Sequence, residues 1–209
     1  MDFFLQTFVL LLVVVDPFGL TPIFSALTSR ESVAARRQIA IKSVLISAAV
    51  LAFFTFAGSL LLDYLGIGLP AFRMAGGILL FLVAIDMLSV RHSGLSSATE
   101  KERMEARERG DVSVFPLAIP LIAGPGALTT VMLLTSDRGL MLSIGVLAIV
   151  LLVLAITFAM FLLAGRIQRL LGETGINVIT RLLGILLAAL AMQFFVDGLR
   201  DSLPVLVGG

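Results

Sequence analysis

The sequence predicts an all-α, polytopic membrane protein with six transmembrane helices, and three observations support this fold class. First, 59% of its 209 residues are apolar and 14% are charged, whereas about 25% are charged in an average soluble domain. Second, six apolar runs are long enough to span a bilayer. Third, the second half of the chain repeats features of the first in the same order. The runs cover residues 3–28, 40–64, 71–90, 114–135, 140–165 and 176–199.

The first run is interrupted by an acid, two prolines and a glycine in the segment Val15–Pro22. Proline donates no backbone hydrogen bond and moves the residue before it out of the α region. Asp16 and Pro17 have the signature of a new helix start, an N-cap followed by proline. The helix before them would be about 20 Å long, shorter than a hydrocarbon core of about 30 Å. The break is therefore expected at mid-membrane, where an acid is a functional candidate unless it only marks a kink.

The fourth run has a matching break. Its short apolar approach contains Pro116 and Pro120, and the small residues of the segment Gly124–Ala127 follow. Backbone N–H groups there can approach a ligand, and a helix N-terminus suits a carboxylate. Thr129 and Thr130 could add hydroxyl donors. The alternative is that the glycines only allow close helix packing in lipid.

Three short motifs recur in the two halves at a nearly constant spacing. They are Pro-x-x-Leu-Thr at 17–21 and 125–129, Ala-Gly at 57–58 and 164–165, and Gly-Ile-Leu-Leu at 77–80 and 184–187. A repeat of three spans is an odd number, so the second copy enters the membrane from the opposite face. This inverted-topology plan is common in secondary transporters, whose sites lie where discontinuous helices meet. The predicted units are residues 1–90 and 114–209, separated by a charged cytoplasmic loop at 91–113.

Basic residues indicate the orientation. They concentrate in the loops after the first, third and fifth runs, at Arg30, Arg36, Arg37, Lys42, Arg91, Lys101, Arg103, Arg107, Arg109, Arg166 and Arg169. The opposite loops hold little beyond Arg73 and Arg138. By the positive-inside rule the three basic loops are cytoplasmic, which places both termini on the outer, periplasmic side.

Four segments, at 15–24, 73–81, 116–130 and 172–184, resemble the MarC family of bacterial inner-membrane proteins, which includes small neutral amino acid transporters. The resemblance covers essentially the whole chain. It implies six transmembrane helices and a location in the bacterial inner (plasma) membrane. For some relatives it also implies proton-coupled transport of glycine, alanine and similar amino acids.

We expect a small amino acid to lie between the two breaks. Its ammonium would face Asp16, and its carboxylate would face the amides near Gly124–Ala127. Asp16 is also a candidate proton-coupling group, and so is Asp86 in the third run, unless Asp86 is an interfacial or helix-pairing residue. The substrate-binding residues predicted in this way are Asp16, Pro17, Gly19, Thr21, Gly124, Pro125, Gly126, Ala127, Thr129 and Thr130.

The leading functional hypothesis is a secondary transporter of small neutral amino acids that works by alternating access. The alternatives are an exporter or channel for another small solute, and a membrane protein without transport activity. We expect no enzyme, cofactor or metal, because no His or Cys lies in any run and no nucleotide-binding loop is present. A net charge of +1 gives no reason to expect a nucleic-acid partner. Small-residue segments such as Ala75–Gly77 would suit packing within one chain or between chains of an oligomer.

Overall fold

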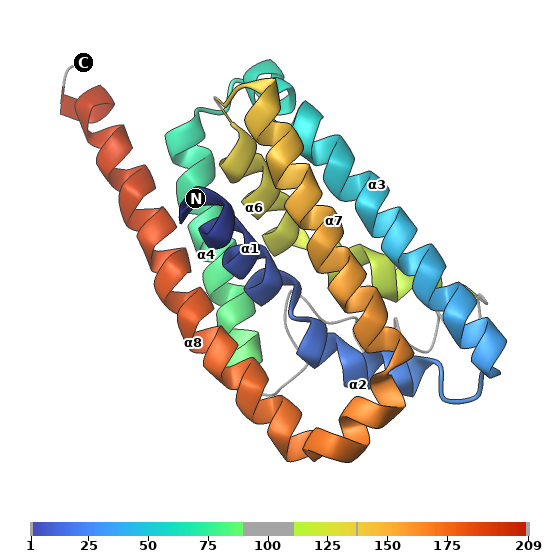
Figure 1. Cartoon of the computed structure of the whole chain (residues 1–209). Coiled ribbons are helices and arrows are strands. Elements are labelled where there is room, and N and C mark those ends of the chain that lie inside the picture. Colours follow the sequence, from blue (N-terminus) through green and yellow to red (C-terminus); the bar gives the residue numbers. More distant parts are fainter. Residues whose placement is uncertain (1, 90–110, 137, 208–209) are drawn as a thin grey trace.

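The computed structural model describes residues 2–89, 111–136 and 138–207. Most of the predicted charged loop at 91–113 lies outside these ranges. The described residues form α1 (Asp2–Val15), α2 (Pro17–Leu27), α3 (Val33–Leu65), α4 (Leu69–Ser89), η1 (Ser113–Ile122), α6 (Pro125–Thr135), α7 (Leu140–Leu162) and α8 (Ala164–Val207) (Figure 1).

The helical fold class is confirmed. Among the described residues, five helical stretches are long and apolar enough to cross a membrane, and there are six if the bent pair of η1 and α6 is one span. Large apolar side chains point outward from these helices, for example Leu60, 69% exposed on α3, and Ile185, 56% exposed on α8. Such side chains suit contact with lipid, which is as apolar as they are.

The structure divides the first span at Asp16, whose φ of 45° and ψ of 67° lie in the left-handed region. The Asp16 N–H donates to Leu12 O over 3.0 Å at the end of α1, and Leu20 N–H donates to Asp16 O over 3.0 Å in the first turn of α2. Pro17 between them has no N–H to continue the α1 ladder. Aspartate is one of the few residues other than glycine whose backbone adopts the left-handed conformation.

The fourth span is bent by 53° between η1 and α6. Inside η1, Phe115 and Ile119 have extended backbone angles, with φ of −130° and −128°. Each precedes a proline, whose ring excludes the α conformation of the residue before it. The proline spacing therefore explains why this approach to α6 is irregular. The depth of both breaks in the membrane stays a prediction.

Corresponding helices of the two predicted units pack against each other. The α4 helix packs along α8, α3 packs along α7, and α1 contacts α6. The cross pairs match as well, because α3 contacts η1 and α6 while α7 contacts α1 and α2. Figure 1 shows α4 and α8 side by side, with α1 and α6 between α4 and α7. The inverted relation of the units stays a prediction.

Glycines bring α4 and α8 close together. A carbon added to Gly77 would lie 2.7 Å from Ala191 O, and one added to Gly198 would lie 2.8 Å from Pro70 O. Only a residue without a side chain fits such backbone contacts. Near the same end of this pair, Arg73 forms an ion pair with Asp201 over 2.5 Å. The α4 and α8 helices therefore form a closely packed pair next to the broken helices.

Two helices extend further than their apolar runs. The α3 helix has 33 residues and is about 50 Å long, so its basic first turns lie beyond a hydrocarbon core of about 30 Å. The α8 helix begins at Ala164, near the end of the fifth run, and continues through residues 166–175, where the sequence suggested a loop. It turns at Gly172, which has a φ of 63°. Residues that precede the sixth run thus continue the helix around a corner (Figure 1).

A polar network holds the end of α2. The Ser25 hydroxyl donates to Gln168 Oε1 on α8 over 3.1 Å, and Arg36 Nε on α3 donates to Thr28 Oγ1 over 3.0 Å. Arg36 also donates to Ser25 O over 3.4 Å, near the negative end of the α2 dipole. The second half of the broken span is thereby tied to both α3 and α8.

Candidate functional site

Asp16 caps the helix that follows it, as the sequence predicts. Its Oδ1 accepts a hydrogen bond from Gly19 N–H over 3.1 Å, and the residue is 9% exposed. Pro17 occupies the first position of α2. The buried Thr21 hydroxyl donates to Pro17 O over 2.8 Å. The carboxyl group is therefore held at the break, with one oxygen engaged by the start of α2.

Gly19 leaves room for that carboxyl group. A carbon added to Gly19 would lie 2.2 Å from Asp16 Oδ2 and 3.3 Å from Thr180 Oγ1. Both oxygens thus border the space beside Gly19. Thr180 comes from α8, in the other predicted unit, and sequence reasoning gave it no role. The signal for it was a hydroxyl residue directly before Arg181 in an apolar run, which alone does not indicate a neighbour of Asp16.

The second break has no such cap. Gly124 precedes α6, and no side chain there bonds to the first turn. A carbon added to Gly124 would lie 2.3 Å from Pro120 O, so the turn requires glycine. Pro125 has no N–H, and Leu128 N–H donates to Gly124 O over 3.0 Å. The N–H groups of the α6 first turn therefore lack the acidic cap that α2 has, which suits them to an anion.

The structure brings the two breaks together. A carbon added to Gly126, in the first turn of α6, would lie 3.3 Å from Val14 Cγ1, in the last turn of α1. On α4, Leu80 Cδ2 and Val83 Cγ2 would lie 3.2 and 3.6 Å from the same added carbon. The Val14 position is two residues before Asp16 in the chain. The carboxyl end of α1 therefore lies against the start of α6. A meeting of the two amide ends, at the starts of α2 and α6, stays a prediction.

The predicted site residues are mostly buried. Eight of them are buried: Asp16, Pro17, Thr21, Gly124, Gly126, Ala127, Thr129 and Thr130. The other two, Gly19 and Pro125, are half-buried.

The two threonines of α6 make different contacts. The Thr130 hydroxyl donates to Gly126 O over 2.8 Å, so its proton is used within α6. The Thr129 methyl group occupies the space beside Gly76 of α4.

Asp86 lies in the last turn of α4 and is half-buried. Its position there agrees with the expectation that it is nearer the end of the span than its centre. Its role in proton relay stays a prediction.

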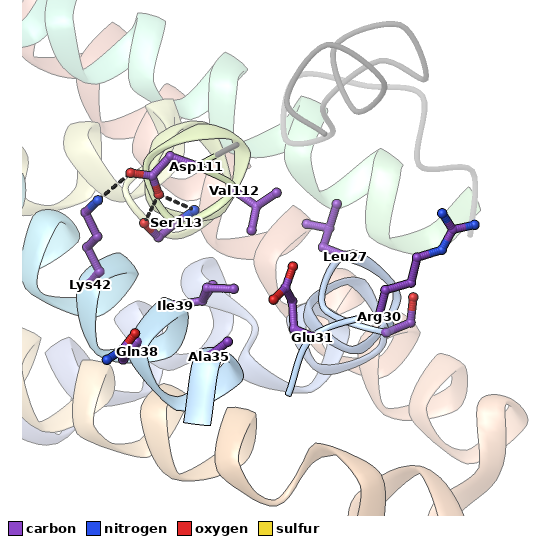
Figure 2. A pocket seen from close by; sticks show the side chains of 11 residues that line it. Leu27, Arg30, Glu31, Ala35, Gln38, Ile39, Lys42, Asp111, Val112 and Ser113 are labelled. Carbon is purple, nitrogen blue, oxygen red and sulfur yellow. Dashed lines mark hydrogen bonds and ion pairs between the residues drawn. The ribbon is translucent and has the colours of Figure 1, made fainter. Parts of the chain in front are cut away.

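A polar cavity of about 510 Å³ lies at the end of α2, beside the first turns of α3 (Figure 2). It is lined by Leu27, Ser29, Arg30, Glu31, Ala35, Gln38, Ile39, Lys42, Asp111, Val112 and Ser113. Lys42 forms an ion pair with Asp111, which also accepts hydrogen bonds from Ser113. These hydrogen bonds hold the pKa of the Asp111 carboxyl group below its ordinary value. Sequence reasoning did not predict this cavity.

Elsewhere on the described surface, an apolar groove of about 230 Å³ lies between α4 and α8. The described residues contain no group of three or more His, Cys, Asp or Glu side chains that could hold a metal ion. The arrangement at the breaks comprises the buried Asp16 carboxyl group at the start of α2 and the uncapped first turn of α6.

Known membrane proteins are similar to this chain over nearly its whole length. The chain is 39% identical to the UPF0056 membrane protein YvbG of Bacillus subtilis, over 98% of each chain. It is 38% identical to a UPF0056 membrane protein of Aquifex aeolicus, over 96% of this chain and 94% of the relative. It is also 38% identical to the UPF0056 inner membrane protein YhgN of Escherichia coli, over 92% and 93%.

No solved structure matches the chain. Residues 1–203 match the family model described as MarC family integral membrane protein. With the several apolar helices described above, this match identifies an integral membrane protein. The chain belongs to the MarC family of integral membrane proteins.

Proposed function

We propose that this protein is a secondary transporter of small neutral amino acids such as glycine and alanine, coupled to protons. It works in a bacterial inner membrane with both termini outside. The observation that carries the proposal is the contact between the end of α1 and the start of α6, at Val14 and Gly126. Meeting ends of discontinuous helices are where secondary transporters bind substrates and coupling ions.

The chemistry of the two breaks complements a zwitterion. The Asp16 carboxylate supplies a negative group for the ammonium, and the uncapped amides at Gly126 and Ala127 supply a positive helix end for the carboxylate. Proton exchange at Asp16 would couple the movement of substrate to the proton gradient.

The packing of the two units supports alternating access. Equivalent helices contact each other, with α4 on α8 and α3 on α7. Rocking of one unit against the other would move the breaks between the two sides while the half-helices keep their geometry. At glycine contacts such as Gly77 on Ala191 O, no side chain projects between α4 and α8, which would let one helix slide along the other.

Uptake by the purified protein in proteoliposomes tests the proposal. Labelled glycine and alanine should accumulate, faster with an inward proton gradient than without one, and empty liposomes should show no gradient-dependent signal. Flat traces for both amino acids would contradict the proposal. They would favour an exporter, a channel for another solute, or a family member without transport activity.

A further inference from the structure

The cavity at the end of α2 has the size of a ligand site. Its volume of about 510 Å³ falls in the range of roughly 300–1,000 Å³ that is typical of small-molecule sites. Its walls come from the end of α2, the first turns of α3 and residues 111–113 before η1. It therefore joins the cytoplasmic end of one broken span, as the basic residues orient it, to the start of the other.

The charges around the cavity balance. Two basic side chains, Arg30 and Lys42, and two acidic ones, Glu31 and Asp111, line it. Lys42 and Asp111 pair with each other on one wall. Figure 2 shows the Glu31 carboxyl group directed between Ile39 and Leu27 on another wall. Within the described part of the chain, that group has no ion pair or hydrogen bond.

We propose that this cavity is a second binding station for a zwitterionic free amino acid, at the cytoplasmic mouth of the transporter. Glu31 faces the ammonium. Lys42 faces the carboxylate, because an ammonium group has three N–H donors and Asp111 takes one. The apolar walls at Leu27, Ile39 and Val112 accept the side chain. The inference rests on the proposed function for its choice of ligand, and it adds a site separate from the breaks.

The balanced charge selects a zwitterion over an ion. A simple anion would be attracted by Lys42 but repelled by Glu31. A simple cation would be attracted by Glu31 but repelled by Lys42. These side chains are exposed, and exposed charge pairs contribute only about 0.2–1 kcal/mol each. Binding is therefore weak and rapidly reversible, as suits a station through which substrate passes.

The absence of cysteine in the sequence gives a direct test. Gln38→Cys places a thiol in the cavity wall, and Arg37→Cys places one on the neighbouring exposed position outside it. Each purified variant is labelled with a hydrophilic maleimide in the presence of alanine, propionate or ethylamine at equal ionic strength. Alanine should slow labelling of the Gln38→Cys variant and not of the Arg37→Cys variant, and the two single-charge analogues should slow neither. Ala35→Cys, also in the wall, repeats the measurement.

Two further variants separate this station from the breaks. Adding Glu31→Gln should raise the alanine concentration needed for half-protection by about two- to fivefold, the effect of one exposed charge. Adding Asp16→Asn should leave protection unchanged, because Asp16 does not line the cavity. Loss of protection with Asp16→Asn, equal protection of the Arg37→Cys variant, or protection by propionate alone would overturn the inference.

The inference and the proposed function can fail separately. Uptake of alanine without protection of the Gln38→Cys variant would overturn only the second station. Protection without uptake would support an amino acid site in this cavity and contradict transport. Absence of both would contradict both.

Discussion

Val14, in the last turn of α1, packs against Gly126, in the first turn of α6, so that a carbon added to Gly126 would lie 3.3 Å from Val14 Cγ1. Leu80 approaches the same point to 3.2 Å. Neither neighbour belongs to α6, and both are buried core residues. The position therefore has room for glycine, and any longer side chain must displace the end of α1 or the centre of α4.

Gly126→Leu should destabilise the protein and abolish uptake. Overpacking a filled core costs about 1–3 kcal/mol, and here it would also separate the two helix ends. Thermal unfolding in detergent and uptake in proteoliposomes measure the two effects. Gly165→Leu is the matched control, because nothing approaches Gly165 within 4 Å. Equal uptake by both variants would show that contact between the breaks is unimportant.

Gly19→Ala should dislodge the Asp16 carboxyl group. The added methyl group would lie 2.2 Å from Asp16 Oδ2, so the hydrogen bond from Gly19 N–H to Oδ1 would be lost. Loss of an N-cap costs about 1 kcal/mol. We expect a lower unfolding temperature and slower uptake. Gly68→Ala, whose added carbon would meet only Pro70 at 3.7 Å, should change neither. An unchanged unfolding temperature in Gly19→Ala would contradict the cap geometry.

Thr180→Val should impair uptake, whereas Thr180→Ser should not. The buried Thr180 hydroxyl borders the same space as Asp16 Oδ2 and has no hydrogen-bond partner among the described residues. It is therefore available to a charged group at this break, and such a hydrogen bond contributes about 1.5–3 kcal/mol. Removing the hydroxyl while keeping the side-chain shape should slow uptake about tenfold or more. The serine variant keeps the donor and serves as the control. Similar kinetics in all three proteins would mean that Thr180 only packs.

The Lys42–Asp111 pair should contribute stability that depends on pH. Hydrogen bonds lower the pKa of Asp111 in the folded protein, so their stabilisation is present above the unfolded-state pKa and is lost as the pH falls through the folded one. Asp111→Asn should therefore unfold at a slightly lower temperature than the parent at neutral pH. This difference should shrink below about pH 4. A difference that stays constant with pH would contradict the assignment.

Local chemistry is what made two helix starts within the apolar runs predictable. Asp16-Pro17 and Gly124-Pro125 carry their own helix starts, because proline removes a donor and the preceding residue leaves the α region. The structure places helix starts at both pairs. Apolar length likewise predicted the helical fold class, since spanning segments must satisfy their own backbone groups.

Contacts between distant segments were not predictable in the same way. Thr180 lies next to Gly19 only because α8 packs beside α2. The cavity at Lys42 and Asp111 depends on how the start of η1 meets α3. A single sequence does not show which distant segments pack together, so these polar residues look isolated in it. The helical corner at Gly172 was also missed, because polar residues on a helix that leaves the membrane resemble a loop.

Solute and proton flux measured together, on purified Asp16→Asn beside the parent protein, test the central claim most directly. Asparagine is also a good N-cap and tolerates the left-handed conformation, so Asp16→Asn should unfold at the parent temperature. The parent should move protons with glycine, and Asp16→Asn should move neither. Parent-like coupled uptake by a folded Asp16→Asn variant would contradict the account and remove Asp16 from the site.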